Sequence, residues 1–194
     1  MRPSVRAALV GLLLWGLITP AWSVRAASDA DDRRARIGLR MFRTVLAADL
    51  DLEAKVSGGK LRLLIVDWDE PARAEGFATE LKQTGQGEGT GQIRDWPYTV
   101  EVTRDIAEAT RNGPKPAGIY IVQDLPPEAL KAVIDYGVRE HVIVYSAIEG
   151  HVEKGVLGGL DVGVRVLPYI NTTTLHASSV HLKELFLKVA KTYE

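Results

Sequence analysis

The sequence LRLLIVDWDE, residues 61–70, joins a short apolar run to three carboxylates. Two glycines precede it at positions 58–59 and Pro71 follows it, and an apolar run of this length between turn-forming residues is typical of a strand buried on both faces. The residues from Pro71 to Gln83 favour a helix. A buried strand followed directly by a helix predicts the start of a parallel α/β sheet, with the carboxylates at the strand end where such sheets bind ligands.

The same order of elements recurs downstream. We expect further strands over residues 98–103, 117–122 and 141–145, and helices over residues 105–110 and 126–138. Each parallel crossover places a helix on one face of the sheet. The predicted fold class is therefore α/β: a single three-layer domain with a largely parallel sheet of the Rossmann or flavodoxin-like kind.

Both ends of the chain depart from this alternation. Apolar residues at helical spacing predict an N-terminal helix over about residues 31–50. Four glycines between residues 155 and 163 predict an antiparallel, glycine-rich pair of strands at the edge of the sheet. We expect a C-terminal helix to follow, capped by Thr173 or Thr174. Its apolar stripe comprises Leu182, Leu185, Phe186 and Val189.

Residues 85–91 alternate glycine with polar residues and contain nothing to bury, so they predict a flexible glycine-rich loop. The loop lacks the Lys-Ser or Lys-Thr after its last glycine, and the strand before its first, that a phosphate-binding loop requires. We therefore expect no nucleotide and no other cofactor.

The first 26 residues have the three parts of a secretory signal peptide. Arg2 and Arg6 form a basic start, residues 7–18 are apolar, and small residues follow. The apolar stretch is shorter than the roughly 20 residues that a membrane-spanning helix needs. The sequence therefore predicts export through a cleaved signal peptide.

Cleavage is expected after Ser23 or after Ala26, and it leaves residues 27–194 as one α/β domain. The chain contains no cysteine, so this domain has no disulfides and no thiolate metal site. Removing the leader takes away three arginines and changes the formal net charge from −1 to −4. This balance argues against nucleic acid, which requires a basic face. Together these features favour the periplasm of a Gram-negative bacterium.

The candidate ligand-binding residues share one position, because each follows a predicted strand of the parallel sheet. They are Trp68, Asp69, Asp124, Ser146 and Glu149. The carboxyl ends of parallel strands lie along the same edge of a sheet, so we expect these side chains to gather there. The Trp68 ring would add an aromatic wall to a small-molecule site.

The carboxylates of Asp67, Asp69 and Glu70 allow two other interpretations. They could cap the helix that begins at Pro71, stabilised by its positive end. They could also bind a divalent cation, which would require several oxygens to converge on one point.

We find no catalytic motif, and the chain is predicted not to be an enzyme. No Gly-x-Ser-x-Gly sequence occurs, and Ser178-Ser179 has no base at a useful spacing. No two of the four histidines stand four residues apart, so no metal site is predicted. An enzyme of unknown type is kept only as a third hypothesis.

Three features occur together near the C-terminus: Gly158-Gly159 before an alternating strand, the sequence RVLPYIN over residues 165–171, and a leucine- and lysine-rich helix pattern over residues 182–191. This combination resembles the YfiR family of exported bacterial proteins, and the leader and the length fit as well. The resemblance implies a periplasmic regulatory protein that restrains a membrane-bound diguanylate cyclase in cyclic-di-GMP signalling. The chain departs from the family in having no cysteine, so redox control by disulfides cannot be carried over.

The same Ile-Asn dipeptide and closing helix also resemble, more weakly, the C-terminal part of solute-binding proteins of ABC transporters. Those proteins have two α/β lobes where this chain has room for one. Two hypotheses follow: a YfiR-like regulatory protein that binds a membrane signalling protein, and a single-lobe solute-binding module that binds a transporter component. A homo-oligomer is compatible with both.

Overall fold

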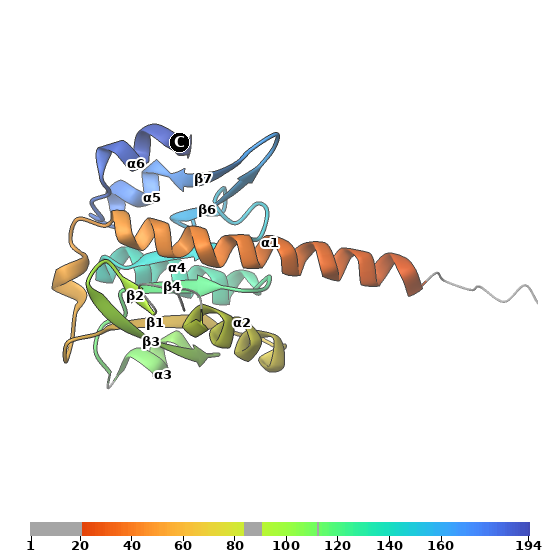
Figure 1. The fold of residues 1–194 in the computed structure, drawn as a ribbon, viewed down its shortest axis with the longest axis horizontal. Coiled ribbons are helices and arrows are strands. Elements are labelled where there is room, and N and C mark those ends of the chain that lie inside the picture. The colour runs from red at the N-terminus through yellow and green to blue at the C-terminus, as the bar shows by residue number, and fades with distance from the viewer. Residues whose placement is uncertain (1–20, 84–90, 112) are drawn as a thin grey trace, which may run out of the picture.

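The computed structural model describes residues 21–83, 91–111 and 113–194 (Figure 1). Its centre is one eight-stranded sheet in the order β2-β3-β1-β4-β5-β6-β7-β8. The strands are β1 (Leu61–Val66), β2 (Gln92–Ile93), β3 (Trp96–Thr103), β4 (Gly118–Ile121), β5 (Ile143–Ser146), β6 (Gly158–Val162), β7 (Val166–Asn171) and β8 (Lys191–Tyr193). The strands β3-β1-β4-β5-β6 run parallel, in the order of a flavodoxin-like sheet. The predicted fold class is confirmed.

The winding of the sheet reverses beside β1. The chain passes from β1 to β3 on one side and then returns to β4 on the other side. The neighbouring strands β1 and β4 therefore form the topological switch point, where the carboxyl ends of a doubly wound sheet leave a crevice for ligands.

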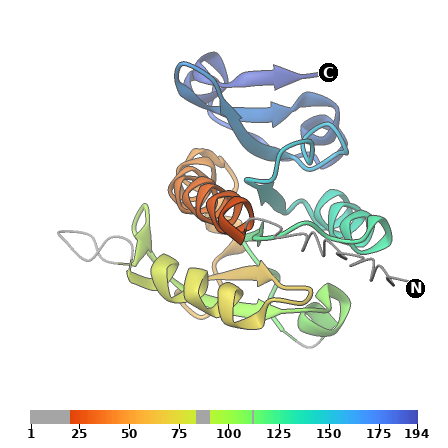
Figure 2. The same cartoon turned by 90° about the vertical axis from the view of Figure 1, so that its right-hand side faces the viewer.

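Helices cover both faces of the sheet, which is why most residues of its central strands are apolar. The helices are α1 (Ala21–Ala48), α2 (Pro71–Gln83), α3 (Ile106–Arg111) and α4 (Pro127–Glu140), with a short 3-10 turn, η1 (Leu52–Lys55). Leu63 and Ile65 of β1 belong to the core beneath α1 and α2, whereas Leu64 and Val66 belong to the core beneath α3 and α4. Figure 2 shows α1 and α2 on one side of the sheet and α4 on the other.

Helix α1 takes the place of a crossover helix. The connection between β5 and β6 contains turns and no helix. Helix α1 covers the sheet there instead, where it contacts β4, β5 and β6. Helix α1 therefore completes the helical layer over β5 and β6, which the connection between these two strands leaves uncovered.

Helix α1 approaches the sheet closely because Gly38 has no side chain. A Cβ at this position would lie 2.7 Å from the Cβ of Ala147 and would overlap the hydroxyl of Tyr120. That hydroxyl donates a 2.7 Å hydrogen bond to the backbone oxygen of Ala35, within α1. Burial raises the pKa of Tyr120, so the phenol stays protonated and able to donate.

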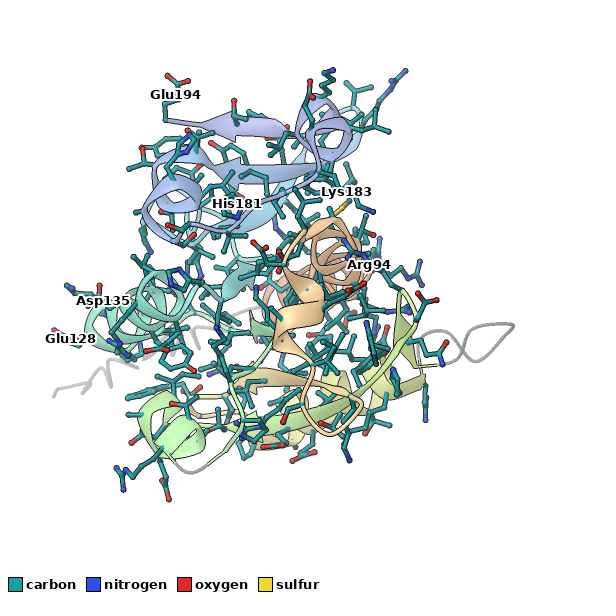
Figure 3. All side chains as sticks on the ribbon, turned by 90° about the vertical axis from the view of Figure 1, so that its left-hand side faces the viewer. Arg94, Glu128, Asp135, His181, Lys183 and Glu194 are labelled. Atoms are coloured by element: carbon teal, nitrogen blue, oxygen red, sulfur yellow. The ribbon has the colours of Figure 1, made fainter. Side chains whose placement is uncertain are left out.

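Two other segments hold the C-terminal end of α1. The guanidinium Nε of Arg94 donates to the backbone oxygen of Ala47 at 3.0 Å, and the backbone N–H of Lys183 donates to Ala48 at 2.9 Å. Figure 3 shows Arg94 and Lys183 at this end of the molecule. Both donors satisfy carbonyl groups that a helix end leaves unpaired, and the arginine charge also complements the negative end of the helix.

The N-terminal helix is already formed at Ala21, the first described residue, and not only from near residue 31, and it ends at Ala48. The polar residues 28–32 include neither glycine nor proline, so nothing there ends a helix. Both predicted cleavage positions, after Ser23 and after Ala26, fall within the first turns of α1, which extend beyond the rest of the domain (Figure 1). The leader up to residue 20 and the loop residues 84–90 lie outside the described residues, and export stays a prediction.

Within the described ranges, none of the helices combines the length and the hydropathy that crossing a bilayer requires.

The C-terminal segment differs from the single closing helix that was expected. Two short helices, α5 (Thr172–Ala177) and α6 (Glu184–Val189), precede the strand β8. This strand pairs with β7 and becomes the edge of the sheet in place of the antiparallel β6–β7 pair.

The side chain of Asn171 caps α5, because it accepts a 2.8 Å hydrogen bond from the backbone N–H of Thr174. Ser179 has a φ of 49°, and this left-handed conformation separates the two helices. The expected apolar stripe is broken, with Leu185 and Val189 exposed.

His141 ends α4 rather than beginning a strand. Its φ of 58° is left-handed, and its backbone N–H donates to the carbonyl of Gly137 as a C-cap. The strand β5 begins two residues later, at Ile143.

We predict that Gly38→Ala destabilises the protein by about 1–3 kcal/mol, because the added methyl overpacks the contact between α1 and the sheet. Gly76→Ala in α2 is the matched control, since no atom lies within 4 Å of its added Cβ. This control should stabilise the protein by about 0.5–1 kcal/mol through helix propensity. Urea denaturation with an unchanged m-value measures both free energies of unfolding. Equal stabilisation by the two substitutions would contradict the close approach.

Candidate functional site

A cleft of about 450 Å³ opens at the carboxyl ends of β1, β4 and β5. Its residues come from α1, from the loops after these three strands, and from the first turn of α2. They are Asp31, Arg34, Asp69, Glu70, Arg73, Gln123, Asp124, Ala147, Ile148 and Glu149. We name this the switch-point cleft, because it lies beside the switch point between β1 and β4.

Helix α1 contributes one wall of the cleft through Arg34. The guanidinium Nε of Arg34 donates to the backbone oxygen of Ala147, and its Nη2 donates to that of Leu160 at 3.1 Å. One side chain therefore ties α1 to the loop after β5 and to β6. Its hydrogen bonds go to neutral carbonyl groups, so they hold the wall in place without cancelling the charge of the arginine.

The second arginine of the cleft is held by carboxylates. The Nε of Arg73 lies 2.9 Å from Asp32 of α1, and its Nη1 lies 3.6 Å from Glu70. The guanidinium also stacks over the ring of Phe77, 5.6 Å from its centre. The charge of Arg73 is therefore balanced within the protein, and the ion pair with Asp32 joins α1 to α2.

Gln123 lies two residues after the end of β4 and is buried, with 4% of its surface exposed. Its side-chain Nε2 donates to the carboxylate of Asp69. Its Oε1 has no hydrogen-bond partner. The orientation of the amide is fixed, because a reversed amide would place two oxygen acceptors against each other. The floor of the cleft therefore contains a buried acceptor that lacks a donor.

Ser146, His151 and Asp124 form a hydrogen-bonded series beneath the cleft. The Oγ of Ser146 lies 2.9 Å from Nδ1 of His151, and Nε2 of His151 lies 2.8 Å from Oδ1 of Asp124. Ser146 also accepts a 3.1 Å hydrogen bond from the backbone N–H of Ile148. Complete pairing follows if the serine hydroxyl donates to Nδ1 and the ring donates from Nε2 to the carboxylate.

Two opposing effects set the pKa of His151. Burial lowers the pKa, Asp124 opposes this change through its hydrogen bond and charge, and Lys154 lowers the pKa further. The net result is a lowered pKa, so the ring is neutral at pH 7. The hydrogen bond from His151 in turn lowers the pKa of Asp124, whose carboxylate stays ionised.

This series contains the residue types of a hydrolase triad, but its arrangement is structural. Ser146 and His151 have no exposed surface, while the side chain of Asp124 is 71% exposed, so the hydroxyl is enclosed and the carboxylate faces outward. A nucleophilic serine requires the opposite arrangement, with its hydroxyl open to substrate. The geometry instead fixes the turn from Ser146 to His151 against the end of β4.

The structure brings together three of the five predicted site residues as lining of the cleft: Asp69, Asp124 and Glu149. Ser146 lies beneath them in the hydrogen-bonded series. Trp68 is 39% exposed and does not line the cleft.

The carboxylates after β1 have separate roles. Asp67 is buried and accepts a 3.0 Å hydrogen bond from the backbone N–H of Glu70, so it stabilises the turn before α2. Among the described residues, no three histidine or acidic side chains converge as metal ligands.

Sequence reasoning missed Arg34, Arg73, Gln123 and His151. Gln123 follows β4 as the predicted residues follow their strands, so its position was a usable signal. Both arginines lie within helices. Arg34 reaches the strand ends only through the docking of α1, whereas Arg73 lies in the first turn of α2, which follows β1.

We predict that His151 makes stability decline as the pH falls below about 7. Its pKa is lower in the folded state than the unfolded value of about 6.5, so the unfolded chain binds more protons in this range. The stabilisation is complete above pH 6.5 and declines as the pH falls through 6.5 toward the folded pKa. Asp124, whose pKa is also lowered, adds a separate loss below about pH 4.

Urea unfolding at pH 7.5, 6.5 and 5.5 measures this dependence. His151→Gln should flatten the decline, while His181→Gln, at an exposed ring paired with Asp51, should keep it because His151 is intact. A decline of unchanged size in His151→Gln would assign the pH dependence to another group.

Comparison with known proteins yields fold neighbours and no family. No protein-family model matches the chain, and no curated protein matches it. The resemblance to the YfiR family therefore stays a prediction.

Among solved structures, a conserved domain protein from Vibrio cholerae is 15% identical, with 75% of this chain and 58% of that chain covered and a TM-score of 0.50. The ABC domain in complex with L-Trp from Streptococcus pneumoniae is 13% identical, with 76% and 61% covered and a TM-score of 0.49. This chain thus spans about three fifths of the length of either neighbour. The likeness to the Vibrio protein supports the α/β fold and nothing finer.

Proposed function

We propose that this chain binds a small polar solute in the switch-point cleft and acts as an exported, single-lobe solute-binding module of an ABC transporter. The observation that carries the proposal is the unpartnered Oε1 of buried Gln123 on the floor of the cleft. A buried acceptor without a donor is costly, and a ligand that supplies the donor removes that cost. The cleft volume of about 450 Å³ lies within the usual range for small-molecule sites.

The function proposed is binding without catalysis. In support, the one serine–histidine pair at the cleft is enclosed and committed to holding a turn. The rigid wall formed by α1 and the charged groups around it suit recognition of a polar molecule. Because the cleft opens to solvent, a bound solute keeps one face exposed, and a transporter component in the periplasm would cover that face.

Ligand binding should raise the melting temperature by mass action. At a ligand concentration of 100 times Kd, the gain is about 2.7 kcal/mol, which corresponds to roughly 5–10 °C for a domain of this size. Thermal unfolding with a panel of sugars, amino acids, amines, carboxylates and nucleosides identifies the class. The solute-binding proposal fails if no member of a broad panel shifts the melting temperature.

Gln123→Leu tests whether the cleft is the binding site. The substitution removes the unpartnered acceptor at nearly constant volume, so the ligand-free protein should keep its melting temperature within a few degrees while losing most of the ligand-induced shift. Gln83→Leu, at the exposed end of α2, should keep the full shift. A full shift retained in Gln123→Leu would place the binding site elsewhere.

A second candidate function, YfiR-like regulation of a membrane diguanylate cyclase, is favoured by a different observation. Apolar side chains are exposed in the segments that form the β6–β8 edge of the sheet. In the β6–β7 hairpin, Val162 is 52% and Val164 fully exposed, and in α6 Leu185 is 76% exposed. Exposed apolar side chains such as those of the hairpin suit contact with a protein partner.

Val164→Glu should abolish crosslinking to a membrane signalling protein in intact cells if this surface is the contact. Leu50→Glu introduces the same charge at an exposed apolar residue outside the β6–β8 edge and should leave the crosslink intact. Unchanged crosslinking in Val164→Glu would exclude the hairpin as the contact surface.

A further inference from the structure

The charges of the switch-point cleft that are left without a charged partner are mainly negative. Five carboxylates and two guanidinium groups line the cleft. Arg73 is ion-paired with Asp32 and Glu70, so its charge is already balanced. Asp69 and Asp124 differ from that pair, because each accepts a hydrogen bond from a neutral donor, the amide of Gln123 and the ring of His151. A neutral donor fills one acceptor site of a carboxylate and leaves its charge in place. Lys154 offsets part of the charge of Asp124.

Buried Gln123 gives an independent indication of the ligand. Its Nε2 is committed to Asp69, and its Oε1 can only accept. A ligand that satisfies this oxygen must therefore carry an N–H or O–H group. The same group would lie beside Asp69, and a negative neighbour favours a donor that is positively charged.

The cation indicated is organic rather than metallic. Within the described part of the chain, acidic and histidine side chains do not gather in threes as metal ligands. Calcium and magnesium require six or more oxygens around one point. An ammonium group requires only separate acceptors for its N–H donors, and Gln123 with two neighbouring carboxylates supplies them.

We propose that the ligand of the switch-point cleft is an organic cation with a protonated amine, bound by Asp69, Asp124 and the Oε1 of Gln123. This inference rests on the proposed solute-binding function and specifies the chemistry of its ligand. The amine donates to Gln123, and the two carboxylates balance its charge. Arg34, which is tied to backbone carbonyls, restricts the amine to the side of the cleft near β1 and β4.

Isothermal titration of the purified protein with three probes of similar length tests the sign of the charge. The probes are 1,4-diaminobutane, the neutral 1,4-butanediol and the anionic succinate. We expect 1,4-diaminobutane to bind at least tenfold more tightly than either of the others, and we expect its affinity to fall when sodium chloride is raised to 0.5 M.

Substitutions test the residues. Asp69→Asn and Asp124→Asn should each weaken binding of 1,4-diaminobutane by tenfold or more. Asp51→Asn is the matched control, because Asp51 is also an exposed carboxylate bonded to a histidine ring, that of His181. It should leave the affinity unchanged. If Asp124→Asn also disturbs its hydrogen bond with His151, the Asp69→Asn variant still tests the site.

Equal binding of 1,4-butanediol, or preferred binding of succinate, would overturn the cationic ligand while leaving the solute-binding function in place. The same holds if 1,4-diaminobutane does not bind but another compound of the broad panel shifts the melting temperature in a manner that depends on Gln123. Failure of every compound in the panel would overturn both proposals.

Discussion

The structure depends on the close contact between α1 and the sheet at Gly38. A doubly wound sheet needs helices on both faces, and the connection between β5 and β6 supplies none. Helix α1 covers that area only because a glycine faces Ala147 and the hydroxyl of Tyr120. Any larger residue at this position would move the helix outward. The core beneath α1, which includes the rings of Phe42, Tyr120 and Tyr145, would then be opened to water.

The same contact forms one wall of the switch-point cleft. Once α1 lies against β4 and β5, Arg34 reaches the carbonyls of Ala147 and Leu160, and Asp32 reaches Arg73 of α2. These hydrogen bonds fix the wall of the cleft on the side where a crossover helix between β5 and β6 would otherwise lie. The floor comes from the strand ends, and the position of Gln123 there follows directly from the switch point between β1 and β4. The packing of the core and the shape of the cleft therefore both depend on the position of α1.

Much of the fold could be predicted from local patterns. The apolar run over residues 61–66 and the helix that starts at Pro127 depend on neighbouring residues, so their patterns alone identify them. The α1 docking and the roles of Arg34 and His151 could not be predicted, because they depend on contacts that no periodic pattern records. The C-terminal helix pattern failed for a related reason: Ser179 adopts a left-handed conformation, and pairing with β7 draws residues 191–193 into a strand.

The position of α1 at the start of the chain also has a kinetic consequence. Tyr120 is 85 residues from its acceptor in α1, and Arg34 is 113 and 126 residues from its two carbonyl partners. Loops of this length must close before the contacts form, and such high contact order slows folding. Helix α1 can contact α2 and β2 once these have been made, but its contacts with β4, β5 and β6 form only after those strands have been synthesised. The wall that Arg34 forms in the cleft is completed only once β6 has been synthesised, because its second carbonyl partner, Leu160, lies in that strand.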